Sequence, residues 1–402
     1  MPHFIVVGAG QAGASLVAKL RQLGFAGDVT LIGAETAAPY QRPPLSKKYL
    51  LGDMPLERLF LRAERFYADA EIDLVTGKRV AAIDPAAKTL TLDDGGRLAW
   101  DRLALATGAD PIRLPAAIGG DLQGVYLMRT LADADAMAPE FTAGRRALVV
   151  GGGYIGLEAA AVAAGRGLQV TLVEQADRIL KRVAAPETSD YFRDLHRSRG
   201  VDIREGVGLA ELVGRDGRVA AARLQDGTTM EIDFAVVGIG VRPATALAEA
   251  AGLAVENGIR VDAFGRTSHT DIYAAGDCAS FPHGDGRVRL ESAPHAIDHA
   301  EATAAAMLGG DAPYVARPWF WSDQYDVKLQ IAGLNAGYDR VVIRPGKGDA
   351  RSIWYFAGDR LLAVDAMNDA RAYMIGRRLI EAGLSPAPAA LADPATDLKA
   401  LM

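Results

Sequence analysis

Two segments of the chain repeat one pattern, and this pattern limits the possible fold more than any other feature. Residues 4–35 and residues 147–175 each read as an apolar strand, a glycine-rich turn, an alanine-rich helix and a second apolar strand that ends near an acid. This succession is typical of a βαβ unit. Because the two copies lie far apart and differ in detail, we expect two separate uses of one binding module.

The first glycine-rich turn has the spacing G-x-G-x-x-G, with Gly8, Gly10 and Gly13. Gly8 permits a tight turn, Gly10 lets the backbone approach a pyrophosphate, and Gly13 lets helix and strand pack closely. The N-terminus of the following helix offers N–H groups to phosphates. Glu35 is the nearest acid after the second strand. This context predicts a dinucleotide site; a glycine turn without a ligand is the alternative.

The second turn contains Gly151, Gly153 and Gly156, and Glu174 ends the strand that follows. A carboxylate at that point can accept hydrogen bonds from ribose hydroxyls and repel a 2′-phosphate, which favours NADH over NADPH. Arg178 is the nearest base and could weaken this preference. Two dinucleotide sites in one chain predict hydride transfer from a diffusible nicotinamide to a tightly bound flavin.

Composition excludes several classes of protein. The length of 402 residues suggests two or three domains. A net charge of −6 argues against nucleic-acid binding. Cys278 is the only cysteine, so no disulfide or redox-active dithiol can form within the chain. The N-terminus lacks the features of a signal peptide and no apolar stretch is long enough to span a bilayer, so we expect a cytoplasmic location, no membrane partner and no metal site.

Six motifs together resemble one family. They are Gly8–Gly13, Arg42-Pro43-Pro44-Leu45-Ser46-Lys47, Ala106-Thr107-Gly108, Gly151–Gly156 with Leu157-Glu158, Gly276-Asp277, and Pro318-Trp319-Phe320-Trp321-Ser322-Asp323-Gln324. On these motifs the chain resembles, over essentially its whole length, the FAD-dependent, NADH-using ferredoxin reductases of bacterial oxygenase systems, of the putidaredoxin reductase type.

The resemblance implies an α/β, glutathione-reductase-like fold with two Rossmann-type dinucleotide-binding domains and a C-terminal α+β domain. We expect residues 1–108 and 235–315 to form the FAD-binding domain and residues 109–234 the NAD-binding domain. Residues 316–402 would form the C-terminal domain, and its proline- and alanine-rich tail at 386–397 reads as a loop.

The resemblance also implies a catalytic pair. Lys47 would lie beside the flavin ring and pair with Glu158. A cation near the N5–O4 edge of the flavin stabilises the negative charge gained on reduction, and a carboxylate partner would hold that cation in place. The alternative is that Lys47 is a surface lysine and Glu158 an acid favoured by the helix dipole.

Further positions match cofactor contacts of the family. Asp277 would bind the ribityl chain or cap a helix, Arg129 would bind a phosphate or form an interdomain salt bridge, and Trp321, like Trp319, would line the flavin or pack in a core. Related chains often carry an acid where this one has Ala34, so either Glu35 would take over the ribose contact or water would fill the gap. The remaining positions predicted to contact a cofactor are Ala12, Arg42, Val80, Thr107, Gly108, Tyr154, Ile155, Gly238, Gly240, Gly276 and Ala293.

The electron acceptor implied by the resemblance is a small [2Fe–2S] ferredoxin that serves a cytochrome P450 or a ring-hydroxylating oxygenase. An acidic ferredoxin would need a basic patch, for which Arg340, Arg344, Lys347 and Arg351 are candidates; a solvated face is the alternative. We expect a monomer or a weak dimer. A rubredoxin reductase and a redox-dependent interaction protein are the alternatives, whereas a disulfide reductase is disfavoured because the chain lacks a cysteine pair.

Overall fold

The computed structural model describes residues 1–402, which form two compact units. The first unit contains residues 1–42, 55–110 and 241–318. The second unit contains residues 43–54, 111–240 and 319–402. The mixed α/β character predicted from the sequence is present in both units. None of the helices is both long enough and apolar enough to cross a membrane.

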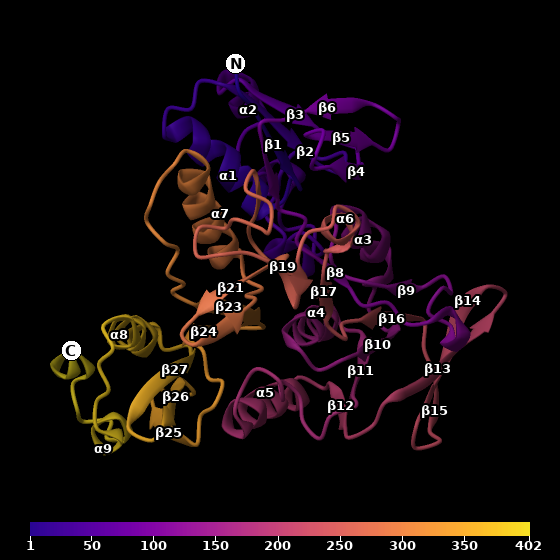
Figure 1. Cartoon of the computed structure of the whole chain (residues 1–402). Helices are drawn as coiled ribbons and strands as arrows, with labels where there is room; N and C mark the ends of the chain where they lie inside the picture. Colours follow the sequence, from indigo (N-terminus) through magenta and orange to yellow (C-terminus); the bar gives the residue numbers. More distant parts are fainter. The chain divides into compact units, whose positions relative to one another are not determined.

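A parallel sheet forms the centre of the first unit, with strand order β20-β7-β1-β2-β3. Strands β1, β7 and β20 are largely apolar and buried, as expected for central strands covered on both faces, whereas the edge strand β3 carries the exposed Asp73. Helices α1 and α7 pack against each other beside this sheet (Figure 1). The elements of the sheet and its helices are β1 (His3–Val7), α1 (Gln11–Gln22), β2 (Asp28–Ile32), β3 (Ile72–Val75), β7 (Arg102–Leu105), β20 (Ile272–Ala274) and α7 (Ala293–Met307).

Smaller sheets and short helices complete the first unit. Two of these sheets have the strand orders β4-β5-β6 and β18-β19-β21-β22, and β8 pairs with β17 where the chain passes between the units. Their bounds are α2 (Arg65–Asp69), β4 (Val80–Asp84), β5 (Thr89–Leu92), β6 (Arg97–Ala99), β8 (Ala109–Pro111), β17 (Val241–Pro243), α6 (Ala246–Ala250), β18 (Val255–Glu256), β19 (Gly258–Arg260), β21 (Ala279–His283) and β22 (Gly286–Val288).

The second unit contains another parallel sheet, with strand order β12-β11-β10-β16-β9. An antiparallel sheet β13-β14-β15 is inserted in the chain between β12 and β16 of this sheet. The elements are β9 (Val125–Tyr126), α3 (Leu131–Met137), β10 (Arg146–Val150), α4 (Tyr154–Gly165), β11 (Gln169–Glu174), α5 (Pro186–Ser198), β12 (Asp202–Glu205), β13 (Leu209–Arg215), β14 (Arg218–Leu224), β15 (Thr229–Glu231) and β16 (Phe234–Val237).

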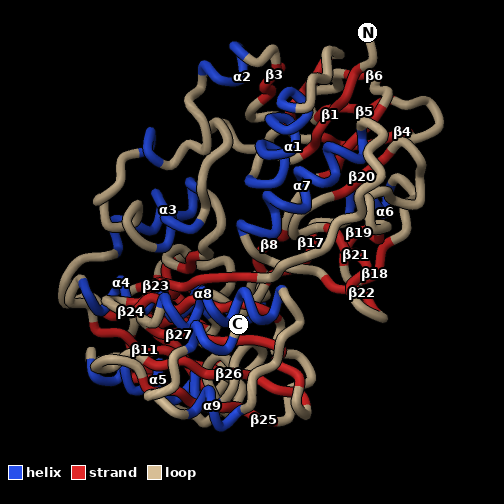
Figure 2. Tube along the Cα trace, turned by 90° about the vertical axis from the view of Figure 1, so that its left-hand side faces the viewer, coloured by secondary structure: helices blue, strands red, loops and turns tan.

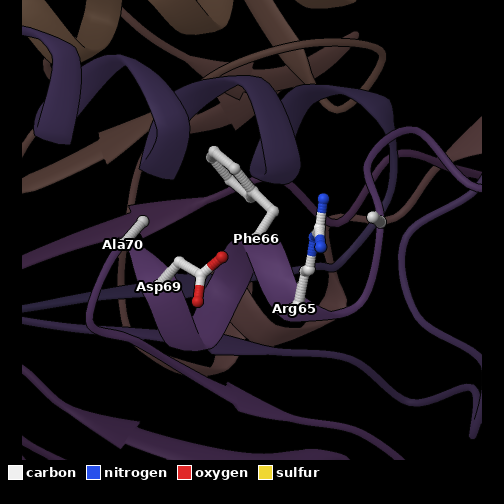
Figure 3. Close-up of a pocket in the computed structure, with 5 residues that line it drawn as sticks. Arg65, Phe66, Asp69 and Ala70 are labelled. Carbon is white, nitrogen blue, oxygen red and sulfur yellow. The ribbon is translucent and has the colours of Figure 1, made fainter.

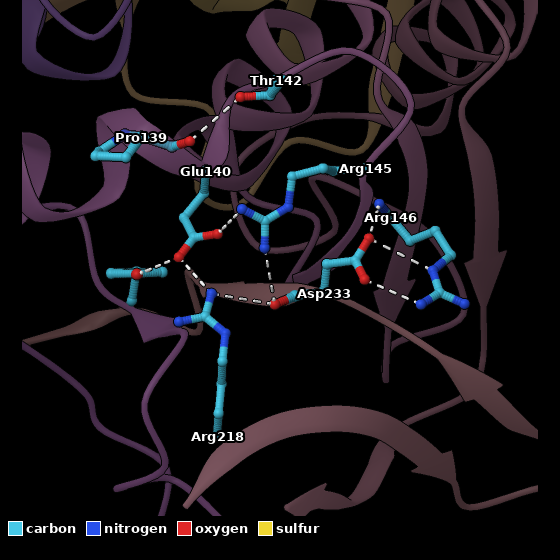
Figure 4. Close-up of polar contacts among 8 residues, drawn as sticks. Pro139, Glu140, Thr142, Arg145, Arg146, Arg218 and Asp233 are labelled. Atoms are coloured by element: carbon cyan, nitrogen blue, oxygen red, sulfur yellow. Dashed lines mark hydrogen bonds and ion pairs between the residues drawn. The ribbon is translucent and has the colours of Figure 1, made fainter. Parts of the chain in front are cut away.

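A cluster of ion pairs fixes the ends of β10 and β16 in this sheet (Figure 4). The carboxylate of Glu140 is only 5% exposed and pairs with Arg145 and, at 2.5 Å, with Arg218. Asp233 pairs with the guanidinium of Arg146 at 2.9 Å and also accepts the Arg146 backbone N–H at 2.7 Å. These contacts set the register of two neighbouring parallel strands.

The rest of the second unit is an antiparallel sheet with strand order β23-β24-β27-β26-β25, covered by helix α8 (Figure 2). One hydrophobic core contains Leu172 of the parallel sheet, Leu329 of the antiparallel sheet and Leu50 of the segment 43–54. The bounds are β23 (Trp319–Gln324), β24 (Val327–Gly333), β25 (Arg340–Pro345), β26 (Arg351–Ala357), β27 (Arg360–Met367), α8 (Ala370–Glu381) and α9 (Pro388–Ala392), and the 3₁₀ helices of the chain are Pro43–Ser46, Leu56–Arg58, Ala116–Ile118, Ala138–Glu140 and Leu398–Leu401.

The structure differs from the sequence prediction at the boundary between residues 234 and 235. Strand β16 pairs with β10, so residues 235–240 belong to the second unit and not to the FAD-binding domain that the sequence predicts for them. The reason is that an apolar strand followed by glycines has the same appearance in either sheet. The other predicted domain boundaries stay a prediction.

The C-terminal tail also differs from the expected loop, because α9 lies within it. Pro388 occupies the first turn, where its missing N–H costs nothing, and the side chain of Leu391 is fully buried. Arg344 explains the order of this tail. Its guanidinium is 7% exposed and donates to the backbone carbonyls of Leu391, Asp393, Pro394 and Thr396. Arg344 is therefore a structural residue and is not part of a docking surface.

Candidate active site

The first glycine-rich loop connects β1 to α1. Gly8 has a φ of +113°, and a Cβ there would lie 2.1 Å from the carbonyl oxygen of Ala106. A Cβ at Gly13 would lie 1.9 Å from the carbonyl oxygen of Gly8. By contrast, a Cβ at Gly10 would meet nothing within 4 Å, and no side chain caps α1. Two glycines are thus required by packing, while the third leaves open space at an uncapped helix N-terminus, which fits a pyrophosphate.

The second loop, between β10 and α4, has the same geometry. Gly151 has a φ of +104°, and a Cβ there would lie 2.4 Å from the carbonyl oxygen of Gly238. A Cβ at Gly156 would lie 2.0 Å from the carbonyl oxygen of Gly151. Gly153 faces open space, and α4 likewise has no side-chain cap. This loop fits a second pyrophosphate for the same reasons.

The acid associated with the first loop is held by side chains. Glu35 accepts a hydrogen bond of 2.5 Å from the hydroxyl of Tyr40. The guanidinium of Arg42 lies 2.7 Å from the other carboxylate oxygen of Glu35. Each of the two charged side chains is about one-third exposed. Glu35 and Arg42, both predicted as cofactor residues, therefore form one ion pair beside the first loop.

The acid of the second loop is held by the backbone. One carboxylate oxygen of Glu174 accepts the N–H of Gly152 at 2.7 Å, and the other accepts the N–H of Ala176 at 2.8 Å. Arg178 donates to the hydroxyl of Ser189 at 2.6 Å and to the carbonyl of Ala184 at 2.9 Å. Because Arg178 is bound to Ser189 and Ala184, it does not count as a candidate partner for the 2′-phosphate of NADPH.

Other predicted positions gather around the first loop. The hydroxyl of Thr107 donates to the carbonyl of Ala244 at 2.7 Å, which fixes the end of β7. Gly276 has a φ of +80°, and a Cβ there would lie 2.9 Å from the Cβ of Ala12. The first unit holds the following predicted cofactor residues: Gly8, Gly10, Ala12, Gly13, Glu35, Arg42, Val80, Thr107, Gly108, Gly276, Asp277 and Ala293.

Lys47 and Glu158 form an ion pair inside the second unit, with 2.6 Å between Nζ and Oε2. The side chain of Lys47 is 17% exposed and that of Glu158 is 3% exposed. The hydroxyl of Ser46 donates to the same carboxylate oxygen at 2.8 Å, and the hydroxyl of Ser322 donates to Oε1, also at 2.8 Å. These three donors satisfy a carboxylate that is almost wholly removed from water. Glu158 is therefore bound by three side chains, in addition to lying near the N-terminus of α4.

Trp321 lies in an aromatic row on β23. Its ring stacks on that of Trp319, with 5.6 Å between the centroids. The guanidinium of Arg377 on α8 lies 5.5 Å from the centroid of Trp319, and Phe320 packs against Tyr154 at 4.9 Å. The hydroxyl of Tyr154 is buried, so its side chain belongs to the core, and only its backbone remains for a phosphate contact. The second unit holds the following predicted residues: Lys47, Arg129, Gly151, Gly153, Tyr154, Ile155, Gly156, Glu158, Glu174, Gly238, Gly240 and Trp321.

Sequence reasoning missed the two serines that bind Glu158. Ser46 and Ser322 both lie in motifs that carry the resemblance, yet no role was assigned to either. In a strand, alternate side chains share a face, so Ser322 and Gln324 of β23 point away from Trp321. This alternation could have indicated that the two polar side chains share a face and act together.

A hollow in the first unit lies apart from these residues. It is lined by Ala63, Arg65, Phe66, Asp69 and Ala70 along α2, as Figure 3 shows. None of the predicted site residues lines it, and it contains neither glycine-rich loop. It therefore has no part in the candidate active site.

Comparison with known proteins agrees with this geometry. Residues 2–300 match the family model of pyridine nucleotide-disulphide oxidoreductases, and residues 319–402 match the model of the reductase C-terminal domain. The chain belongs to this oxidoreductase family. Cys278, the sole cysteine, is buried and donates to the carbonyls of Leu105 and Ala275, so this member has no disulfide of its own to reduce.

Similar members of the family are named as ferredoxin reductases. The chain is 43% identical to the ferredoxin–NAD(P)(+) reductase of a Sphingomonas species, over 99% of this chain and 97% of that one. It is 40% identical to putidaredoxin reductase CamA of Pseudomonas putida, over 100% and 96% of the two chains. The crystal structure of the covalent putidaredoxin reductase–putidaredoxin complex superposes with a TM-score of 0.96 at 40% identity, covering 100% of this chain and 98% of that chain.

These matches confirm four predictions made from the sequence. The resemblance to ferredoxin reductases of bacterial oxygenase systems is confirmed, as is the glutathione-reductase-like fold. Use of FAD and NAD(H), and oxidoreductase activity, are confirmed by membership of the family. The roles of individual residues stay predictions.

Proposed function

We propose that this reductase passes electrons from NADH through FAD to a small [2Fe–2S] ferredoxin, which serves a cytochrome P450 or a ring-hydroxylating oxygenase. One observation carries the proposal: two glycine-rich loops of the same backbone geometry and a buried lysine–carboxylate pair occur in a chain that lacks a cysteine pair. The named relatives support the ferredoxin as acceptor, since they include reductases of the p-cumate and anthranilate dioxygenase systems and putidaredoxin reductase.

Each loop would hold one dinucleotide. The N–H groups at the start of α1 would bind the pyrophosphate of FAD, and those at the start of α4 would bind the pyrophosphate of NADH. Glu174 would accept hydrogen bonds from the adenosine ribose of NADH. When bound, FAD accepts two electrons as a hydride and can release them singly, which suits a one-electron acceptor.

Lys47 would stabilise negative charge at the flavin. Glu158, which accepts hydrogen bonds from Lys47, Ser46 and Ser322, would keep that ammonium in place. The buried position of the carboxylate strengthens its attraction to the cation because little water screens the pair. Trp321 would line the flavin, and its stacking partner Trp319 would support it.

The acceptor would dock through exposed cations. With Arg344 engaged by the C-terminal tail, the remaining candidates are Arg340, Lys347 and Arg351, all exposed. These exposed cations would raise the rate of association with an acidic ferredoxin, and that rate would then depend on ionic strength.

Reconstituted turnover tests the choice of acceptor. The purified reductase is mixed with NADH, cytochrome c and either a [2Fe–2S] ferredoxin or a rubredoxin. We expect reduction of cytochrome c to require the ferredoxin and to slow as salt is added. Turnover with rubredoxin alone would instead identify a rubredoxin reductase. Flavin reduction without transfer to either acceptor would favour a redox-dependent interaction protein.

We also propose that the protein works in the cytoplasm as a monomer or weak dimer. The proposal rests on the single buried cysteine, which suits a reducing compartment, and on the use of NADH. Light scattering after gel filtration at several protein concentrations would test the oligomeric state, and a stable tetramer would contradict it.

A further inference from the structure

A chain of hydrogen bonds leads from the Lys47–Glu158 pair into the interior of the second unit. The hydroxyl of Ser322 lies 2.8 Å from Glu158 Oε1, and Gln324 Nε2 lies 3.2 Å from Ser322 Oγ. Gln324 Oε1 lies 2.8 Å from His196 Nε2, and His196 Nδ1 lies 3.2 Å from the hydroxyl of Tyr325. Ser322, Gln324 and His196 are fully buried.

The donors and acceptors in this chain can be arranged in only one way. An ionised Glu158 can only accept, so the hydroxyl of Ser322 must donate to it. Ser322 has no second proton, so its contact with Gln324 must be a bond donated by the amide nitrogen of Gln324. The amide oxygen of Gln324 then faces His196 and needs a donor, which places the proton of His196 on Nε2.

The charge of His196 agrees with this arrangement. Burial lowers the pKa of His196 to about 4, whereas the hydrogen bond with Gln324 opposes this shift. The ring is therefore neutral near pH 7, with Nδ1 free to accept from Tyr325. Because an amide keeps its protons, the chain orients groups and does not conduct protons.

This series of hydrogen bonds connects three elements of secondary structure. Glu158 lies on α4, Ser322 and Gln324 lie on β23, and His196 lies near the end of α5. Trp321, also on β23, precedes Ser322 and points to the opposite face. The hydrogen-bonded residues thus lie on one face of β23, and the stacked pair of Trp319 and Trp321 lies on the other.

We propose that Gln324 and His196 are positioning residues for the Lys47–Glu158 pair. His196 fixes the amide of Gln324, the amide fixes the hydroxyl of Ser322 as a donor to Glu158, and Glu158 holds Lys47 in place. This inference rests on the proposed function, in which Lys47 acts when NADH reduces the flavin.

A second buried network provides a matched control. Thr188, also on α5, donates to Asp365 at 2.7 Å, and Asp365 accepts from Tyr355 as well. This network joins α5 to β26 and β27 without touching Glu158. Thr188→Val therefore breaks a buried hydrogen bond of α5, the helix that also carries His196. It leaves the series of hydrogen bonds from His196 to Lys47 intact.

The kinetic test measures anaerobic flavin reduction of the holoenzyme by stopped flow. For Gln324→Met we expect the limiting rate constant at saturating NADH to fall roughly tenfold, because the hydrogen bonds of Gln324 to Ser322 and His196 are lost, with the NADH dissociation constant unchanged. His196→Leu should behave in the same way, and His196→Gln, whose amide can replace the Nε2 donor, should restore the rate. Thr188→Val should lower the melting temperature but keep the rate of the parent protein.

The spectroscopic test detects the arrangement of these hydrogen bonds through the tautomer of His196. In ¹⁵N NMR spectra of the histidine-labelled holoenzyme, we expect His196 to be the Nε2–H tautomer. In Ser322→Ala the amide of Gln324 is free to turn over, so His196 should populate the Nδ1–H tautomer. An Nδ1–H tautomer in the parent protein would overturn the inference, as would equal slowing by Gln324→Met and Thr188→Val.

Two further variants separate this inference from the proposed function. Lys47→Met and Glu158→Gln should each slow flavin reduction at least as much as Gln324→Met. If they slow it while Gln324→Met does not, only the positioning role fails. If neither slows it, the proposed role of the pair fails, whatever the tautomer of His196.

Discussion

The two phosphate loops share one backbone geometry, yet their acids are held in different ways. Glu35, beside the first loop, is bound by the side chains of Tyr40 and Arg42. Glu174, beside the second loop, accepts the backbone N–H groups of Gly152 and Ala176. The first acid therefore pairs with a cation, whereas the second is bound by backbone N–H groups.

This difference suggests why one loop suits a resident cofactor and the other a substrate. An acid held in an ion pair makes the loop more rigid but repels a nearby phosphate only weakly. An acid held by amides alone can repel a 2′-phosphate and still accept from a ribose. In this account the shared glycine geometry would bind a pyrophosphate, and the way each acid is held would add selectivity between nucleotides.

The largest effects should come from the glycines at which helix meets loop. In Gly13→Ala and Gly156→Ala the new Cβ would lie 1.9 Å and 2.0 Å from a backbone oxygen. We expect the first variant to purify without flavin. The second should stay yellow but bind NADH more than about tenfold more weakly, a loss of over about 1.4 kcal/mol. Absorbance at the flavin bands and NADH titration measure these effects.

Gly165→Ala provides a control on the same helix as Gly156, because a Cβ at Gly165 would meet nothing within 4 Å. It should bind both nucleotides as the parent protein does. Loss of flavin from Gly156→Ala would contradict the assignment of the second loop to NADH.

A smaller effect should come from the two acids. In Glu174→Gln one amide N–H loses its acceptor and the negative charge is lost, so we expect NADH to bind about tenfold more weakly and NADPH to bind no worse. Glu35→Gln should leave nicotinamide selectivity unchanged and alter only retention of the flavin. The ratio of kcat/KM for NADH and NADPH measures the selectivity, and a change of this ratio in Glu35→Gln would break the comparison.

A last comparison concerns how the stability of each unit responds to acid. Burial lowers the pKa of His295 to about 4 and that of His299 well below its usual value, both in the first unit. A histidine kept neutral in the folded state contributes stability above its unfolded pKa of about 6.5, and this stability is lost as pH falls toward 4. His295 alone should cost the first unit about 2 kcal/mol between pH 7 and pH 5.

In the second unit two groups act in opposite directions. His196, with a pKa of about 4, destabilises the folded state on acidification. Burial raises the pKa of Asp365 to about 6, so this carboxyl costs stability as pH rises through 6 and returns it as pH falls. Hydrogen exchange, corrected for intrinsic rates, should show a larger loss of protection at pH 5 in α7 than in α5. Equal losses would contradict the opposition of the two groups.

Much of this could be predicted from local sequence. The strand–glycine–helix pattern fixes each βαβ unit through short-range geometry, and the apolar runs at 327–333 and 360–367 became strands β24 and β27. The sequence around Gly238 does not indicate to which sheet this residue belongs, because that depends on the parallel strand with which β16 pairs. The tail helix α9 likewise depends on Arg344, a distant residue.

The candidate site divides in the same way. The pairing of Lys47 with Glu158 came only from the resemblance, since the two residues are 111 positions apart. Ser322 and Gln324 were visible as alternate residues of a strand, but their partners Glu158 and His196 lie on separate helices. Contacts across elements are set by packing, which no local pattern encodes.

The most direct test of two unlike dinucleotide sites is an anaerobic titration of the purified protein, followed by its visible absorbance. We predict a yellow protein whose flavin bands bleach with about one NADH per flavin, as expected for one hydride transfer, and much more slowly with NADPH. Absence of bound flavin, or no bleaching by either nicotinamide, would contradict the account.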